Sequence, residues 1–484
     1  MRLGGSYSLE ENKTKSKLTD TLDLNSFSFG TYSVYLQSNQ RKKNKYGLTL
    51  FTRTDKYPFY KGLVKGDRSF NINATTELVS SQHNQFLLNA TYRRLKVLNV
   101  QVSSEKDDNT VLGRAEYIAN EWKGLVTGNI LYELGAGQEQ KRDFAYLEVP
   151  AGTGQYAWID YNNDGVQQLN EFELAAFPDQ AKFIRVFTPT NEYVKANYNT
   201  FNYSVSINPH ALLNGSKLKG FSKLLSRTNW QSSMQVSNKS IAQNNFQFNP
   251  FKYGLSDTAL ITLSTVLLNT FSYNRYAGSW GLDISNLQNS GKSLLTYGYE
   301  SRKLNDWIFK IRVNLSRSIT FDVNTKKELN SLGTANAQFE NRNYNIHDYL
   351  LEPRITFIRG TRFRFVTGYS YDDKKNDTAF LGGQKAVSNA LNLESKYNVL
   401  RSASIGATFT FNTIHFTSAH PNDANSTVGY IMLNGLLPGK NYLWNLNFTK
   451  TLLNNLELKV EYEGRKAGDS RTVHRGTASL NALF

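Results

Sequence analysis

The sequence predicts an all-β fold, a transmembrane antiparallel β-barrel of roughly 18–22 strands with one ordered insertion. Many segments alternate apolar and polar side chains with the period of two that is typical of a strand. Aromatic residues make up 13% of the 484 residues, which suits the two interfaces of a membrane barrel. Mean hydropathy is -0.49 and no run of about 18 uncharged apolar residues occurs, so membrane-spanning helices are not expected.

The first 26 residues form a polar lead-in without clear alternation. Strand-like segments then recur every 15 to 25 residues or so, separated by Asn, Asp, Gly, Ser and Lys. We assign residues 27–138 to the first barrel strands and 192–484 to the remaining ones. Because residues 1–17 lack the apolar core of a secretory signal, we expect the chain to be the C-terminal portion of a longer exported protein.

Three of the clearest strand candidates illustrate this pattern, and Arg362–Tyr371 and Ser402–Asn412 are two more. The three are Tyr46–Thr54, Asn84–Arg94 and the longer Trp307–Asn324, which we expect to be one strand. In the last segment Trp307 and Phe309 fall on one face and Lys310 on the other. Such a strand presents one face to lipid and one to a polar lumen.

Residues 139–191 interrupt this pattern. The segment has little alternation and several turn signals, and we expect a short helix near Leu169–Phe177. It is too long for a tight turn, and its many aromatic residues argue against disorder. We therefore expect an ordered insertion that serves as a plug or a cap.

The insertion contains DYNNDGVQQLNE, which matches the calcium-loop template D-x-[DN]-x-[DN]-G-x5-E. Calcium prefers six to eight oxygen ligands, and the spacing supplies them. The ligand from Val166 is its backbone carbonyl. The expected ligands are Asp160, Asn162, Asp164, Val166, Gln168 and Glu171. Gly165 permits the sharp reversal, but Gln167 stands where an apolar residue normally packs. The alternative is an Asn/Asp/Gly turn whose side chains bind their own backbone without a metal.

Composition excludes several other classes of site. Cysteine is absent, so neither disulfides nor thiolate metal sites can form. The 56 Lys and Arg residues against 40 Asp and Glu residues give a net charge of +16, which favours anionic partners such as outer-membrane lipid and lipopolysaccharide. The positive charges are scattered and no recognition helix is found, so we expect no nucleic-acid partner. No nucleophile elbow, phosphate loop or dinucleotide motif occurs, so we expect no enzyme and no catalytic residues.

The chain ends in HRGTASLNALF, in which small or apolar residues alternate with polar ones before a final aromatic residue. This terminus, together with the insertion segment, resembles large outer-membrane β-barrel proteins of the Bacteroidota, many of them uncharacterised. The resemblance implies a location in the bacterial outer membrane. It also implies that the barrel-assembly machinery recognises Ala478, Leu480, Ala482 and Phe484 as an assembly signal.

The function expected from these features is that of a conduit or a scaffold for transport, secretion or surface assembly, with envelope proteins as partners and a calcium-stabilised insertion. One alternative is a secreted or surface-attached all-β adhesin. The apolar strand faces would then meet in a central core instead of facing outward. A second alternative is an outer-membrane hydrolase, which would need a Ser and His pair near one rim.

Overall fold

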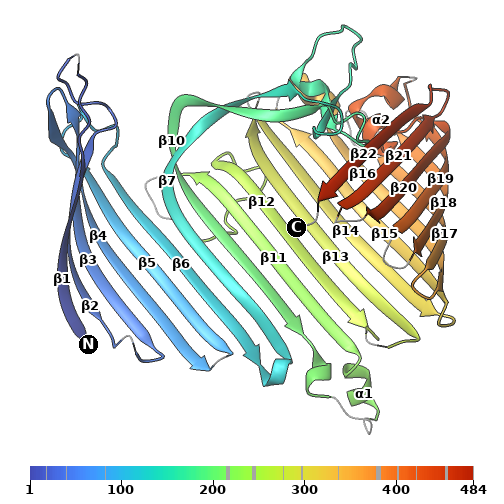
Figure 1. Cartoon of the computed structure of the whole chain (residues 1–484), viewed down its shortest axis with the longest axis horizontal. Coiled ribbons are helices and arrows are strands. Elements are labelled where there is room, and N and C mark those ends of the chain that lie inside the picture. Colours follow the sequence, from blue (N-terminus) through green and yellow to red (C-terminus); the bar gives the residue numbers. More distant parts are fainter. Residues whose placement is uncertain are drawn as a thin grey trace. The chain divides into compact units, whose positions relative to one another are not determined.

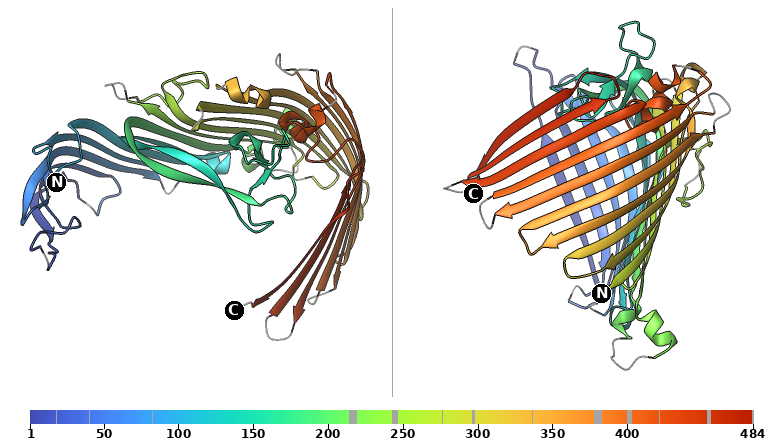
Figure 2. Two further views of the ribbon diagram at one scale, coloured as in Figure 1. Left: turned by 90° about the horizontal axis from the view of Figure 1, so that it is seen from above. Right: turned by 90° about the vertical axis from the view of Figure 1, so that its right-hand side faces the viewer.

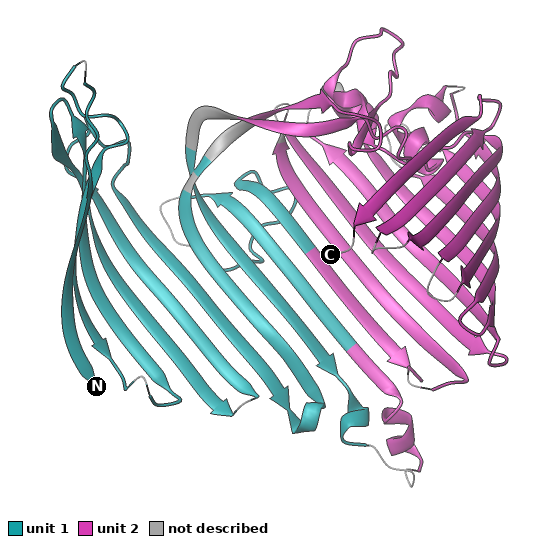
Figure 3. Cartoon of the chain, viewed as in Figure 1, with its two compact units in different colours: residues 1–140, 192–214, 231–265 teal, residues 141–191, 215–230, 266–484 magenta. Residues whose placement is uncertain are grey.

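The computed structural model describes the chain in thirteen stretches (Figure 1). These are residues 1–17, 19–39, 41–81, 83–213, 219–242, 247–275, 277–295, 298–335, 337–377, 383–399, 403–420, 422–452 and 456–482. The chain divides into two compact units, each described here by itself (Figure 3). Unit 1 comprises residues 1–140, 192–214 and 231–265, and unit 2 comprises residues 141–191, 215–230 and 266–484.

Unit 1 is an antiparallel meander in which each strand pairs with the next along the chain. Its strands are β1 (Arg2–Asn12), β2 (Phe27–Gln37), β3 (Lys45–Phe59), β4 (Gly62–Ser81), β5 (Asn84–Val97), β6 (Asp108–Glu121) and the first part of β7 (Val126–Glu148). The second part of β10 (Phe183–Ile207) pairs with β7. Both β11 (Thr228–Ile241) and β12 (Leu260–Tyr273) contribute residues to each unit.

Unit 2 contains a second meander, with antiparallel pairing from β13 through β22. Its strands are β13 (Trp280–Leu295), β14 (Gly298–Asn314), β15 (Ile319–Thr334), β16 (Tyr344–Arg359), β17 (Phe363–Asn376), β18 (Lys385–Val399), β19 (Ala403–Thr417), β20 (Gly439–Leu452), β21 (Leu456–Ala467) and β22 (Val473–Ala482). The insertion adds the short strands β8 (Tyr156–Trp158) and β9 (Phe172–Leu174).

Within the described stretches, helical structure is limited to short elements. The α-helices are α1 (Phe221–Leu225) and α2 (Thr427–Met432), and the short 3-10 helices are η1 (Trp122–Gly124), η2 (Leu169–Glu171), η3 (Pro209–Ala211), η4 (Ala337–Arg342) and η5 (Asp423–Asn425). No helix in the described stretches is long and apolar enough to cross a membrane.

The all-β antiparallel architecture is therefore confirmed. Of the 22 strands in the described residues, β8 and β9 belong to the insertion, and the other 20 fall within the expected range of roughly 18–22. One strand lies inside the expected lead-in, because β1 pairs along its whole length with β2. The rings of Tyr7 and Tyr32 meet across this pair at 4.5 Å. On β1 the face of Leu3, Tyr7 and Leu9 is interrupted by Gly5 and followed by Glu11, so its hydrophobic signal is weak.

The expected single strand from Trp307 to Asn324 is wrong. It is the hairpin of β14 and β15, which turns at residues 315–318. Backbone N–H groups of Leu315 and Ser316 both donate to the carbonyl of Ile319. The Ser316 hydroxyl accepts from the N–H groups of Ser318, at 3.1 Å, and Ile319, at 3.0 Å. Local side-chain bonds of this kind favour a turn over a continuing strand, and alternation alone does not register them.

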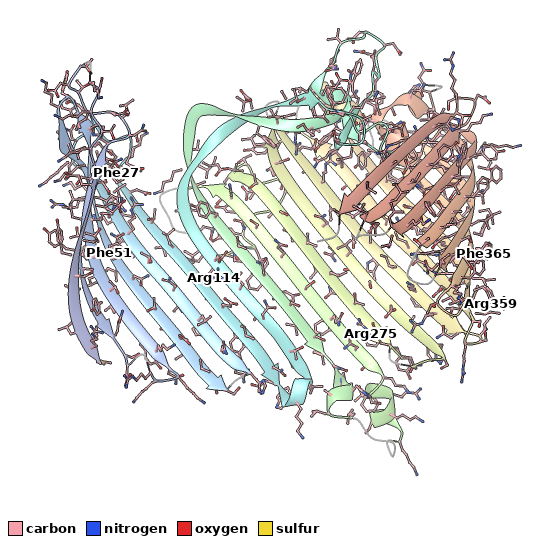
Figure 4. The ribbon with its side chains drawn as sticks, viewed as in Figure 1. Phe27, Phe51, Arg114, Arg275, Arg359 and Phe365 are labelled. Atoms are coloured by element: carbon pink, nitrogen blue, oxygen red, sulfur yellow. The ribbon has the colours of Figure 1, made fainter. Side chains whose placement is uncertain are left out.

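The two faces of the unit 2 sheet differ in chemistry. We call the face that carries Trp307 the outer face and the face against which α2 packs the inner face. The sheet curves around the inner side (Figure 2). Large outer-face side chains are strongly exposed, among them Trp307 (52%), Tyr349 (49%), Ile355 (47%), Ile405 (48%) and Leu446 (49%). Phe365 belongs to the same face, opposite Phe357 (Figure 4). These side chains do not meet in a dry core.

The buried core of unit 2 lies on the inner face at one end of the sheet. Leu332, Ile346 and Ile414 come from the strands, and Val428 and Met432 come from α2. The helix begins at Ser426, whose hydroxyl accepts from the Gly429 N–H at 3.1 Å, a standard N-cap. Further along the strands the inner face is charged, as in the ion pair of Lys326 with Asp348 at 3.0 Å.

Candidate calcium site in the insertion

The insertion is built on extensions of two long strands. β7 runs on to Glu148 and β10 begins at Phe183, so the irregular part is residues 149–182. Within it β8 pairs with β9, and Tyr156 of β8 also pairs with Phe183. The calcium-type loop is the connection of the β8–β9 hairpin.

The helix expected near Leu169–Phe177 is wrong. A single 3-10 turn, η2, is followed directly by β9. The ring of Phe172 stacks on Tyr146 at 4.0 Å and meets Phe183 edge-on at 5.0 Å. A strand places Phe172 and Glu173 on opposite sides, and both side chains are buried there. Tertiary packing therefore overrides the local helical preference.

The loop brings three of the expected ligands together. Carboxylate oxygens of Asp160, Asp164 and Glu171 lie within 4.8 Å of one another. Ligands on opposite sides of a calcium ion are at most about 5 Å apart, since each bond is about 2.3–2.6 Å long. The three carboxylates therefore fit around one ion.

Hydrogen bonds hold these carboxylates in place. The backbone N–H of Gly165, at a φ of 72°, donates to Asp160 Oδ2 at 2.9 Å. Val166 N–H donates to Asp164 Oδ1 at 2.7 Å. Glu171 is only 1% exposed, and its Oε2 accepts from the indole Nε1 of Trp158 at 2.8 Å. The hairpin thus fixes the last ligand before any metal binds.

Two amide side chains belong to the same cluster. Asn162 Nδ2 and Gln168 Nε2 donate to Asp164 Oδ2 at 2.9 Å and 2.7 Å. Rotating either amide by 180° would present its oxygen in place of its nitrogen. Gln168 also forms a capping box with Glu171 at the start of η2. The donor set fits calcium, and the same bonds also make the loop a satisfied Asx-type turn without metal.

Sequence reasoning missed the residues that dock the insertion within unit 2. Asp179 accepts two bonds from Arg465 of β21, at 3.1 Å and 2.9 Å, and the same guanidinium lies 3.8 Å from the centre of the Phe177 ring. Tyr430 of α2 accepts from the Ala176 N–H at 2.8 Å. These partners are more than 250 positions apart in the sequence, so no local pattern could reveal them.

A second docking contact is buried. Arg342 of η4 pairs with Glu173 of β9 at 3.4 Å, with side chains that are 4% and 7% exposed. Burial raises the pKa of the Glu173 carboxyl above its ordinary value, and the Arg342 guanidinium limits the rise.

Three residues of the expected assembly signal, Ala478, Leu480 and Ala482, lie on β22, which pairs with β21. Ala478 stands opposite Val460, and Leu480 stands opposite Leu458. Ala478, Leu480 and Ala482 therefore share the outer face with Val460. Phe484 lies outside the described residues.

A scan of known protein families finds no match to this chain, and no curated protein matches it. Solved structures similar to it include the ferric citrate transporter FecA, at 10% identity over 99% of this chain and 70% of that chain, with a TM-score of 0.33. The ferric preacinetobactin receptor BauA from Acinetobacter baumannii shows 8% identity, coverage of 99% and 71%, and a TM-score of 0.37. The FrpB iron transporter from Neisseria meningitidis shows 11% identity over 98% of this chain and 72% of that chain, with a TM-score of 0.37.

Proposed function

We propose that this chain forms the barrel of a bacterial outer-membrane protein, a conduit or scaffold for transport, secretion or surface assembly. The observation that carries the proposal is the exposed apolar outer face of unit 2. Register joins these side chains into rows across adjoining strands, such as Phe309, Thr325 and Leu351. A water-soluble sandwich would cover such a face with a second sheet. Hydrocarbon is the solvent that suits it.

Strand lengths support this proposal. A tilted strand needs about 9–11 residues to cross the apolar part of a bilayer. β14 has 17 residues and β21 has 12, so both can span it, and β14 leaves polar residues beyond it. On β14 the outer positions change from Trp307, Phe309 and Ile311 to Asn305 and Lys303, which marks one edge of the apolar band.

The inner face supports a polar interior. By register Lys310 and Arg312 lie on the face opposite Trp307, as do Glu461 and Glu463 of β21. Charged residues on this side are expected in a lumen, whereas on a lipid-facing surface they are costly at the depth of the hydrocarbon. No catalytic role is part of the proposal.

Calcium would stabilise the insertion without itself taking part in transport. The loop has three carboxylates and no paired hand, which resembles weak extracellular sites with dissociation constants on the order of 0.1–1 mM. Through β9 the loop is continuous with Glu173 and its buried contact to Arg342. The ion would therefore help to keep the insertion docked on the inner face.

The test is a heat-modifiability gel of the detergent-extracted protein with and without a calcium chelator. We expect the unboiled protein to migrate faster than the boiled protein, because a closed barrel resists the detergent. Identical migration would overturn the barrel. We expect the chelator to increase cleavage of residues 149–182 by added protease, and unchanged cleavage would remove calcium from the proposal.

A further inference from the structure

The outer face of unit 2 carries a groove of about 540 Å³ between β13 and β17. This volume lies within the range of about 300–1,000 Å³ that is usual for ligand pockets. Its lining includes Trp307, Phe309, Thr325, Lys327, Tyr349 and Leu351. All but Thr325 and Lys327 are apolar or aromatic.

Cross-strand register explains the hollow. Trp307, Lys327 and Tyr349 stand directly opposite one another on β14, β15 and β16. In the next row of the same face, Thr325 stands between Phe309 and Leu351. The short threonine side chain between two long ones leaves an apolar depression, and Lys327 lies beside it.

Lys327 differs from its neighbours in charge balance. On β17 and β18, Lys375 pairs with Asp377 at 3.1 Å and Lys385 pairs with Asp373 at 3.4 Å. Within the described stretches Lys327 has no acidic partner, and its Nζ lies 5.6 Å from the centre of the Tyr349 ring. The groove therefore offers a cation that the protein does not neutralise.

The position of Lys327 also matters. On β16 the outer positions change here from Leu351 and Tyr349 to His347, and on β14 they change from Trp307 to Asn305. Trp and Tyr concentrate where a bilayer changes from hydrocarbon to headgroups. An amphipathic ligand with an apolar chain and an anionic head matches this arrangement at both ends.

We propose that the groove binds an acyl chain of an anionic phospholipid whose net negative headgroup is held by Lys327. This inference rests on the proposed membrane location. The lysine supplies a positive charge next to the headgroup, and Trp307 and Tyr349 flank it. The row of Phe309, Thr325 and Leu351 receives the chain.

The test measures lipid binding to the detergent-purified chain by native mass spectrometry. Phosphatidylglycerol and phosphatidylcholine with identical acyl chains are titrated separately. We expect phosphatidylglycerol to bind more tightly. We expect Lys327→Ala to weaken its binding about fivefold, the effect of one lysine near an anionic surface, and to abolish the preference. Equal binding of both lipids to the unaltered chain would overturn the proposal.

Two matched variants sharpen the result. Lys310→Ala removes a lysine from the inner face of the adjacent strand β14, and we expect it to leave phosphatidylglycerol binding unchanged. Thr325→Trp fills the depression and should weaken both lipids to a similar degree. A Thr325→Trp variant that binds as the unaltered chain does would rule out the groove as the site. Tighter binding of lipid A than of phosphatidylglycerol would show that the occupant is not a phospholipid.

Each variant is also run on the heat-modifiability gel. If the unaltered chain shows no shift on boiling, the membrane barrel itself fails, and this inference falls with it. If the shift is present and Lys327→Ala binds phosphatidylglycerol normally, only the lipid site fails.

Discussion

Asp164 is the residue on which the loop depends most. Its carboxylate accepts bonds from the backbone of Val166 and from the side chains of Asn162 and Gln168. Three donors converge on a group that also belongs to the carboxylate cluster. A bound cation would replace the amide donors, so ligand binding and loop geometry are coupled through this one side chain.

Substituting a ligand should weaken metal binding selectively. We expect Asp164→Ala to lower the affinity for Ca²⁺ by roughly tenfold or more, since affinity follows the number of charged ligands. Terbium luminescence excited through Trp158, which contacts Glu171, provides the measurement. Gln167→Ala is the control, because this exposed side chain is not an expected ligand. Equal terbium affinity in both variants would leave the loop as a metal-free turn.

Burial raises the pKa of Glu173 and Arg342 limits that rise, which gives a pH-dependent prediction. In Arg342→Met the carboxyl loses its guanidinium partner, so its pKa should rise further above the ordinary value. Above the ordinary pKa the unfolded carboxyl has released a proton that the folded one retains, so stability must fall as pH rises through this window. We expect the variant's insertion to be cleaved faster at pH 8 than at pH 5. Adding Glu173→Gln should remove the difference, and its persistence would assign it to another group.

At the scale of elements, the insertion is held by a few contacts to α2, β21 and η4. Asp179 and Arg465 form a bidentate pair, and Phe177 lies under the same guanidinium. The buried pair of Glu173 and Arg342 fixes β9. A change in the loop therefore acts directly on the docking contacts, because β9 of the same hairpin carries Glu173.

Breaking the buried pair should cost far more than breaking an exposed one. Arg342→Met leaves a buried carboxylate without its partner, for which about 3–5 kcal/mol is usual. The double variant Arg342→Met with Glu173→Leu should recover most of this loss. Thermal unfolding in detergent gives the comparison. The control is Arg364→Ala, whose pair with Glu394 has side chains 50% and 44% exposed and should contribute about 1 kcal/mol or less. Equal losses in the two single variants would contradict the docking role of Glu173.

At the scale of the molecule, the division between an apolar and a charged face is the feature with the widest consequence. In unit 2 it extends through β13 to β22 by continuous register. α2 and the insertion cover only the inner side, at one end of the sheet. The apolar outer face remains exposed, and whether lipid or water covers it decides whether the protein lies in a membrane.

A pair of arginine substitutions on β19 tests whether the outer face lies in hydrocarbon. Ile405→Arg places a charge on the outer face, and Thr408→Arg places one on the inner face of the same strand. In a bilayer the first should cost about 2–4 kcal/mol near the midplane. We expect it to reduce the heat-modifiable fraction recovered from membranes, with little effect from the second. If Ile405→Arg is recovered as fully as Thr408→Arg, the outer face is not in hydrocarbon.

Alternation predicted the strands because side-chain direction in a strand is a local property of the backbone. It assigned Trp307 and Lys310 to opposite faces, as register confirms. It failed at Ser316, where a hydroxyl that bonds nearby backbone turns the chain, and at Leu169–Phe177, where Phe172 packs against Tyr146. Both failures arise from specific contacts of single side chains, which the alternation of apolar and polar residues does not record.

The sequence by itself determined the all-β class, the two strand faces and the grouping of Asp160, Asp164 and Glu171 in one loop, because each depends on spacing along the backbone. Only the tertiary structure decided how Arg342, Tyr430 and Arg465 hold the insertion, because these side chains reach it from strands and helices far along the chain. The groove beside Lys327 is likewise a feature that only the tertiary structure decided. It exists because three neighbouring strands place a short side chain between two long ones, and register is a relation between strands.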